Sequence, residues 1–182
     1  AEDDAAYVQT FLPNGMGTIA GVSGIVTGMP EVNMYVNYQA ETYKGPYASA
    51  IAPQLKKLGY RTRFWYAGPD SWERIKEYTL AQGFDEFHSY GEIDSKGGNV
   101  WGCDDKYLFS AVESGFESDV PTFDVILTVS NHAPYTVNLA EEGFDPDNVA
   151  GGLPDKLKGD TELIKKLGHF WYADKELTKF VR

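Results

Sequence analysis

Short apolar runs alternate with segments of helical periodicity along most of this chain. The runs predict four strands, at Val8–Leu12, Arg61–Ala67, Phe84–Tyr90 and Thr122–Ser130. Apolar residues at helical spacing predict helices at Tyr47–Lys57, Ser71–Ala81 and Asp104–Ser114, and a long last helix over about Asp160–Val181. This alternation is typical of an α/β fold, with a mainly parallel sheet and helices on both faces.

The C-terminal half of the chain adds two expectations. Val125–Leu127 is apolar throughout, which predicts a strand buried on both faces. Between Asn138 and Gly159 the chain is rich in Gly, Pro and Asp, so we expect a long surface loop there. No stretch of the sequence approaches the roughly 20 apolar residues of a membrane-spanning helix.

A glycine-rich loop places one hydroxyl at a predicted helix start. The loop runs from Asn14 to Gly17, and apolar residues follow it at helical spacing, so Thr18 should begin the helix. The free N–H groups and the dipole of a helix N-terminus attract anions such as phosphate. Threonine is also a frequent helix cap, and the pattern alone favours a capping role over chemistry.

Two other segments place candidate side chains directly after predicted strands. Residues 64–74 read Phe-Trp-Tyr-Ala-Gly-Pro-Asp-Ser-Trp-Glu-Arg and end in a Trp-x-Arg motif. Residues 123–136 form an apolar strand followed by Ser-Asn-His-Ala-Pro-Tyr-Thr. Because open α/β sheets bind ligands along the carboxyl edge, we expect both segments and Thr18 to converge on one cleft.

These motifs together resemble one enzyme family. Asn-Gly-x-Gly-Thr-Ile-x-Gly at residues 14–21 is similar to the nucleophile segment of the lipoteichoic acid synthase and phosphoglycerol transferase branch of the alkaline phosphatase and sulfatase superfamily. The resemblance implies that Thr18 is the nucleophile and a metal ligand. It also implies that Trp72 and Arg74 contact the phosphoglycerol group and that His132 binds a substrate oxygen. Trp-Gly-x-x-Asp at residues 101–105 and Tyr-Ala-Asp at residues 172–174 extend the match to the C-terminus.

Two parts of the family's metal site have no counterpart in this sequence. The family places a Glu-Ser pair after an early strand and an Asp-His pair after the Tyr-Ala-Asp helix, and neither occurs at those places here. We therefore expect residues 1–182 to be a single sulfatase-like catalytic domain fragment that lacks the N-terminal and C-terminal metal-binding segments. The fragment alone should be inactive, whereas the intact parent would use a divalent metal, manganese before zinc or magnesium.

The resemblance implies phosphoglycerol transfer through a covalent intermediate on threonine. A threonine hydroxyl is almost un-ionised at neutral pH, so it needs a metal or a base to become a nucleophile. The donor would be a phosphatidylglycerol-like lipid and the acceptor a glycan or a glycerol phosphate. The bacterial parent would be anchored in the cell membrane through segments outside this chain, with this domain on the periplasmic or extracellular side.

Other interpretations stay open at this point. A sulfatase is disfavoured because the Cys/Ser-x-Pro-x-Arg signature is absent. A phosphoethanolamine transferase or a phosphodiesterase of the same superfamily, and a non-catalytic domain that binds an anionic glycan, remain alternatives. A net charge of −11 argues against nucleic acid, whose binding depends on Lys and Arg.

Each candidate residue also has a structural interpretation. Without its motif, Trp72 would be expected in the core, Arg74 in a surface ion pair, and His132 in a structural hydrogen bond. Asn37, Tyr38 and Tyr66 are further candidates for lining the cleft, although their spacing does not require it. The single cysteine, Cys103, is expected to pack as a small apolar residue, and His88 and His169 are expected to be structural.

Overall fold

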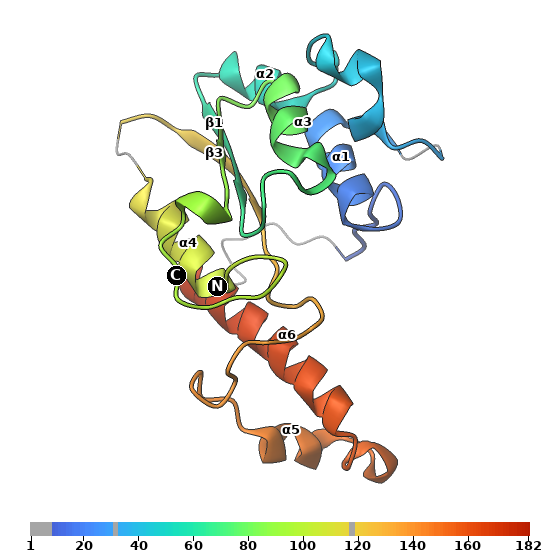
Figure 1. Cartoon of the computed structure of the whole chain (residues 1–182), viewed down its shortest axis with the longest axis vertical. Coiled ribbons are helices and arrows are strands. Elements are labelled where there is room, and N and C mark those ends of the chain that lie inside the picture. The colour runs from blue at the N-terminus through green and yellow to red at the C-terminus, as the bar shows by residue number, and fades with distance from the viewer. Residues whose placement is uncertain (1–8, 31–32, 117–118) are drawn as a thin grey trace.

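The computed structural model describes residues 9–30, 33–116 and 119–182, and its centre is a parallel sheet of three strands (Figure 1). The strands are β1 (Arg61–Tyr66), β2 (Glu86–His88) and β3 (Thr122–Leu127), in the order β2-β1-β3. Both β2 and β3 run parallel to β1, which lies between them. The predicted α/β fold class with a parallel sheet is confirmed.

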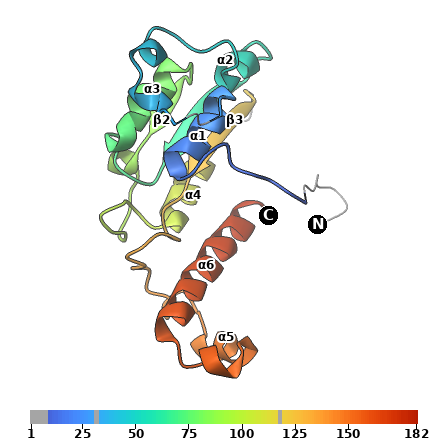
Figure 2. The ribbon, with the colours of Figure 1, turned by 90° about the vertical axis from the view of Figure 1, so that its right-hand side faces the viewer.

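Within the described ranges, six α-helices surround and extend this sheet. They are α1 (Thr18–Thr27), α2 (Ile51–Lys56), α3 (Ile75–Ala81), α4 (Asp105–Ser114), α5 (Pro146–Gly152) and α6 (Thr161–Phe180). Short 3-10 turns lie at Val36–Tyr38, Ala40–Tyr43, Trp72–Arg74, Tyr90–Glu92 and Asp155–Leu157. Figure 2 shows α1, α2 and α3 gathered around the sheet, whereas α6 projects away from it and carries α5 at its far end.

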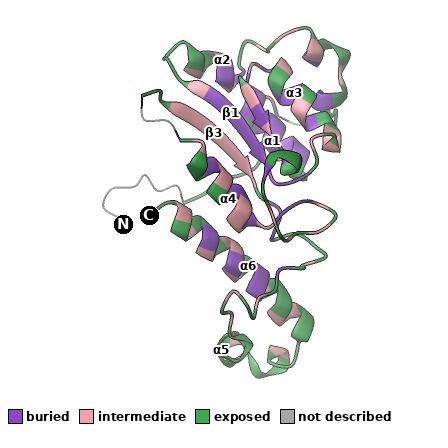
Figure 3. Cartoon of the chain, turned by 60° about the vertical axis from the view of Figure 1, so that its left-hand side comes forward, coloured by how far each residue is buried: buried purple, intermediate pink, exposed green. Residues whose placement is uncertain are grey.

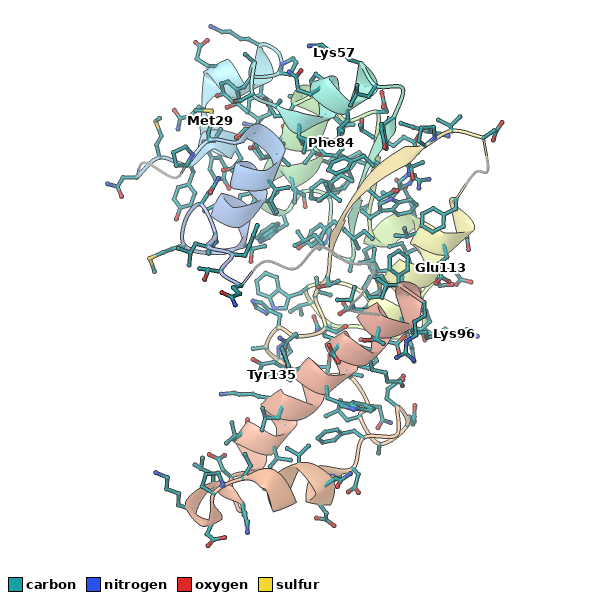
Figure 4. The ribbon with its side chains drawn as sticks, turned by 180° about the vertical axis from the view of Figure 1, so that it is seen from behind. Met29, Lys57, Phe84, Lys96, Glu113 and Tyr135 are labelled. Atoms are coloured by element: carbon teal, nitrogen blue, oxygen red, sulfur yellow. The ribbon has the colours of Figure 1, made fainter. Side chains whose placement is uncertain are left out.

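Alternate residues of β1 pack on opposite faces of the sheet. Phe64 is fully buried and stacks on Phe87 at 5.5 Å between ring centroids, with the Phe84 ring edge-on at 5.8 Å. Phe84, labelled in Figure 4, belongs to the same core on the side of α2 and α3. On the other face, Arg63 and Trp65 lie next to the end of α4 at Gly115. Helices therefore cover both faces, as predicted.

The long helix α6 begins with a side-chain cap and is held against α4. The Asp160 carboxylate accepts a hydrogen bond from the Leu163 N–H at 2.9 Å. Phe180 stacks on Phe109 of α4 with 4.8 Å between ring centroids. The buried Tyr172 accepts a hydrogen bond from the Lys106 N–H at 3.2 Å. None of the helices in the described part of the chain is long and apolar enough to cross a membrane.

Three predictions about secondary structure need correction. Residues 9–12 form no strand. Phe11 and Leu12 are 78% and 77% exposed, and no strand of the described residues pairs with them. Val8 lies outside the described residues. The expected loop at 138–159 contains α5, because Asp145 caps the Asp147 N–H at 3.0 Å and Pro146 follows in the first turn. Other expected elements are present with shorter bounds.

The third correction concerns β3. Its six residues are only partly buried, because β3 is an edge strand that pairs with β1 on one side (Figure 3). Between β3, α4 and α6 lies a groove of about 530 Å³, lined mainly by apolar side chains and by Asp105 and Asp174. The apolar sequence of the strand was read correctly as core-forming, but the burial on its second side is absent among the described residues.

Candidate active site

Thr18 is the first residue of α1, and no described residue bonds its hydroxyl. The N-cap is Gly17, with φ at 85°, and no side chain caps this helix. The capping role that the pattern alone favoured for Thr18 is therefore wrong. The glycine at the cap adopts a backbone conformation that L side chains rarely take, which lets the chain turn sharply into the helix. Thr18 is exposed, and its hydroxyl has no hydrogen-bond partner among the described residues.

The Thr18 side chain lines a pocket of about 130 Å³ at the carboxyl edge of the sheet. The pocket is lined by Thr18, Tyr66, Trp72, Trp101, Leu127, Thr128, Val129 and His132. Tyr66 and Leu127 are the last residues of β1 and β3, so the pocket lies where the strands end. The structure thus brings together three of the four predicted site residues, from segments that are far apart in the sequence.

Aromatic rings form much of the pocket wall. The Tyr66 and Trp72 ring centroids are 5.5 Å apart, and the Trp101 ring meets the His132 ring edge-on at 4.9 Å. Burial raises the pKa of Tyr66 to about 12, so its phenol is a neutral hydrogen-bonding group near pH 7. The wall is therefore apolar with a few polar atoms, which is typical of small-molecule sites.

Two glycines allow the loop with Trp101 to lie on the end of β1. A Cβ on Gly102 would come within 1.9 Å of the Ala67 carbonyl oxygen, and its φ is 140°. A Cβ on Gly68 would meet the Trp101 carbonyl oxygen and the Tyr66 ring at 2.4 Å. These close approaches bring Trp101 into the pocket, so the Trp-Gly motif was the signal in the sequence for a wall residue that the site prediction left out.

The loop that carries His132 is fixed to α4. Asp105 Oδ1 accepts hydrogen bonds from the Val129 and Ser130 N–H groups, both at 3.0 Å, while Ser130 Oγ accepts one from the Asp105 N–H at 2.8 Å. Asp105 is 1% exposed, and burial raises the pKa of its carboxyl although these hydrogen bonds lower it. His132 itself is exposed, with Nδ1 2.6 Å from the Ala133 carbonyl oxygen.

Arg74 is the predicted site residue that does not line the pocket. Its Nε and Nη2 donate to Glu77 Oε2 at 2.9 and 2.6 Å, and its guanidinium lies 4.1 Å from the centroid of the Tyr43 ring. The hydrogen bond to Glu77 raises the pKa of Arg74 further. The surface ion pair that the sequence offered as the structural interpretation is what the structure shows.

The described residues do not fit a divalent metal by themselves. The pocket offers hydroxyls and one imidazole but no carboxylate, and hard divalent cations take carboxylate oxygens. In the described ranges, no cluster of three or more His, Cys, Asp or Glu side chains could hold a metal ion.

His88, expected to be structural, stacks on Trp65 with 4.0 Å between ring centroids and contacts Glu86 and Glu92.

A family model decides where this chain belongs. The model for the sulfatase family matches residues 6–181, almost the whole chain. The chain is a member of the sulfatase family. This confirms the predicted resemblance at the level of the superfamily. No curated protein matches the chain at significant similarity.

Solved structures of this superfamily share the fold. The lipoteichoic acid synthase LtaP from Listeria monocytogenes matches 93% of this chain with a TM-score of 0.70 and 21% identity. An alkaline phosphatase superfamily protein from Vibrio parahaemolyticus matches 87% with a TM-score of 0.64 and 23% identity. The phosphoglycerol transferase GacH from Streptococcus pyogenes matches 90% with a TM-score of 0.57 and 16% identity. This chain spans only 40%, 38% and 44% of these three structures, respectively.

Proposed function

We propose that the intact protein is an extracytoplasmic, metal-dependent phosphoglycerol transferase, and that this chain supplies the nucleophile and the substrate side of its site. One observation carries the proposal: the Thr18 hydroxyl, at the N-terminus of α1, shares a pocket with Trp72 and His132 at the carboxyl edge of the sheet. Membership in the sulfatase family and the fold shared with LtaP and GacH support the same class.

In this proposal Thr18 Oγ1 attacks the phosphorus of a phosphodiester. The bond from phosphorus to the lipid alcohol breaks, and the glycerophosphate group stays on Thr18 until an acceptor hydroxyl or water takes it. The N–H groups at the start of α1 would hold the phosphate oxygens, and His132 would donate a hydrogen bond to a substrate oxygen. Trp72 and Trp101 would pack against the glycerol carbons.

The proposal also needs two groups that the described pocket does not contain, a divalent metal and the Arg74 guanidinium. A divalent metal, manganese in first place and zinc or magnesium otherwise, would favour the ionised form of the Thr18 hydroxyl, and its carboxylate and imidazole ligands would have to come from outside the described residues. Arg74 would have to turn from Glu77 to reach a phosphate oxygen, which it could bind with two hydrogen bonds.

The substrates follow from the same class. GacH is known in complex with sn-glycerol-1-phosphate, and we propose the same chemical group for this pocket. The donor would be a phosphatidylglycerol-like lipid and the acceptor a glycan or glycerol phosphate, with membrane contact through other segments of the parent. A sulfatase with a cysteine-derived nucleophile fits less well, because Thr18 holds the helix start and Cys103 is fully buried, with its pKa raised to about 11 by burial.

The test is to look for the covalent intermediate. The intact protein would be incubated with manganese and phosphatidylglycerol vesicles, and mass spectrometry would search for a glycerophosphate adduct on Thr18. Thr18→Ala should abolish the adduct while leaving binding of sn-glycerol-1-phosphate largely intact, because it removes only the attacking oxygen. Absence of the adduct in the unmodified protein, together with rapid hydrolysis of an aryl sulfate, would overturn the proposal in favour of a sulfatase.

The chain of residues 1–182 on its own should show no turnover of a chromogenic phosphodiester with manganese, zinc or magnesium. The reason is that its described residues supply no carboxylate next to Thr18. Turnover equal to that of the intact protein, and lost in Thr18→Ala, would show that the activating groups are already within this chain.

A further inference from the structure

The turn that carries Trp72 and Arg74 has an unusual backbone. Glu73 has φ at 51° and ψ at 22°, and Arg74 has φ at 55° and ψ at 29°. Two successive residues other than glycine in the left-handed region are uncommon, because the Cβ atom crowds the backbone there. Such a conformation persists only where surrounding groups fix it, and it often lies next to functional sites.

Asn37 is the residue that fixes this turn. It is fully buried, and its Nδ2 donates hydrogen bonds to the Glu73 carbonyl oxygen at 2.8 Å and to Glu73 Oε2 at 3.2 Å. The two residues are 36 positions apart in the sequence, so this contact ties the 3-10 turn Val36–Tyr38 to the turn after β1. Both bonds end on the residue between Trp72 and Arg74.

Asn37 also supports Arg74, through the side chain of Tyr43. The Tyr43 hydroxyl donates a hydrogen bond to the Asn37 carbonyl oxygen. The Tyr43 ring in turn carries the Arg74 guanidinium at 4.1 Å. The orientation of Trp72, toward the pocket, and that of Arg74, toward Glu77, therefore both depend on groups that Asn37 holds.

Asn37 lies beside the helix that begins with Thr18. It borders a small hollow together with Ile19 and Ala20, the two residues that follow Thr18 in α1. We propose that Asn37 is a positioning residue for the active site, which holds the Trp72–Arg74 turn in its left-handed conformation so that Trp72 faces Thr18 across the pocket. The part of this proposal that concerns substrate rests on the proposed function.

The first arm of the test needs no ligand. Fluorinated tryptophan gives one ¹⁹F resonance for each of the four tryptophans, and Trp72→Phe identifies the resonance of Trp72. Asn37→Leu should shift or broaden the Trp72 resonance and leave that of Trp171, on α6, unchanged. If Asn37→Leu fails to fold by circular dichroism, Asn37→Ser replaces it, because a serine is too short to reach the Glu73 carbonyl.

Two further variants separate positioning from general stability. Gln82→Leu is the matched control: Gln82 is also a fully buried amide, bonded to the Thr42 carbonyl at 2.8 Å and the Tyr47 N–H at 3.0 Å, so its loss should lower stability without moving the Trp72 resonance. Glu73→Gly added to Asn37→Leu should return the resonance toward its original position, because glycine adopts the left-handed backbone without a Cβ clash. A folded Asn37→Leu with an unchanged Trp72 resonance would overturn the proposal.

The second arm measures binding of sn-glycerol-1-phosphate by NMR titration. We expect Asn37→Leu to bind about tenfold more weakly, the scale of one lost hydrogen bond, and Gln82→Leu to bind as the unmodified chain does. If the intact protein, supplied with the divalent metal, does not bind this probe, the proposed function fails, while the ¹⁹F result still decides whether Asn37 holds Trp72. Equal affinity in Asn37→Leu with a displaced Trp72 would show that the turn has no part in the site.

Discussion

The pocket around Thr18 and the groove between β3, α4 and α6 meet at the carboxyl end of β3, but the pocket is much more closely packed than the groove. The pocket is small, and glycines, hydrogen bonds and ring contacts bring its walls together from five segments. The groove is about four times larger, with volumes of about 530 and 130 Å³, and its lining includes Phe170 and Leu177, which are 62% and 49% exposed. The candidate pocket is therefore closely packed within this chain, whereas the other side of β3 has no packed partner among the described residues.

Two carboxylates show the same contrast on one face of the sheet. Asp124 accepts hydrogen bonds from Arg63 Nε and Trp65 Nε1, both at 2.7 Å. Burial alone would raise the pKa of Asp124, but these partners lower it below its usual value. Asp105 lines the groove, and its Oδ2 is buried without a hydrogen-bond partner in the described chain. Hydrogen bonds from Arg63 and Trp65 therefore compensate for the burial of the Asp124 carboxylate, whereas only one of the two Asp105 carboxylate oxygens has hydrogen-bond partners.

The largest effect should come from breaking the matched pair. Arg63 is 2% exposed, and Arg63→Leu would leave the Asp124 carboxylate buried without its cation. We expect the free energy of unfolding, measured by urea denaturation, to fall by about 3–5 kcal/mol. The double variant Arg63→Leu with Asp124→Leu should recover much of this loss, because an apolar pair needs no compensation. A single variant as stable as the unmodified chain would contradict the buried pair.

The two carboxylates should give opposite dependences on pH. The pKa of Asp105 is raised above the ordinary 3.8, mainly by burial, so its contribution to stability is complete below that value and is lost as the pH rises through the folded pKa. The pKa of Asp124 is lowered, so its contribution is present above 3.8 and is lost as the pH falls through the folded pKa.

Asparagine variants make this difference measurable. Asp105→Asn keeps an oxygen that can accept from the Val129 and Ser130 N–H groups, so the variant should gain stability relative to the unmodified chain as the pH rises above 3.8. Asp124→Asn should lose its disadvantage as the pH falls below that value. Urea midpoints measured on both sides of 3.8 would check both signs, and parallel curves for the two variants would contradict the contrast.

The sequence predicted the pocket better than the groove, for a physical reason. A strand followed by a motif at its carboxyl end gives both the position and the chemistry of a side chain, and this placed Trp72 and His132 in the pocket. Thr18 was placed there by its glycine-rich loop and helix start, although the strand predicted before it does not form. Arg74 was predicted from the same motif as Trp72, but its guanidinium direction depends on Tyr43 and Glu77, which local sequence does not reveal. The roles of the four predicted site residues in catalysis and substrate binding remain predictions.

A local sequence pattern also does not show whether a strand lies at the edge of its sheet. The apolar run at Val125–Leu127 predicts a strand, but whether the strand has one neighbour or two depends on the rest of the sheet. The same limit explains Phe11 and Leu12, whose apolar character suggested a strand that has no partner in the described structure. Long helices with a capping residue, such as α6 behind Asp160, were predicted closely because their signal is local.

The smallest effect on stability should come from a substitution in the groove, and its size tests whether the groove is open in solution. Leu177 is 49% exposed, so Leu177→Ala removes few packed contacts and should lower the free energy of unfolding by less than about 1 kcal/mol. Leu127, a partly buried residue packed against the core at the end of β3, is the matched control, and Leu127→Ala should cost more, about 2 kcal/mol or above. Both values come from urea denaturation, measured at a dilute and at a higher protein concentration. A cost for Leu177→Ala equal to that of Leu127→Ala, growing with protein concentration, would mean that another copy of the chain covers the groove in solution, and the contrast with the pocket would then belong to the isolated chain alone.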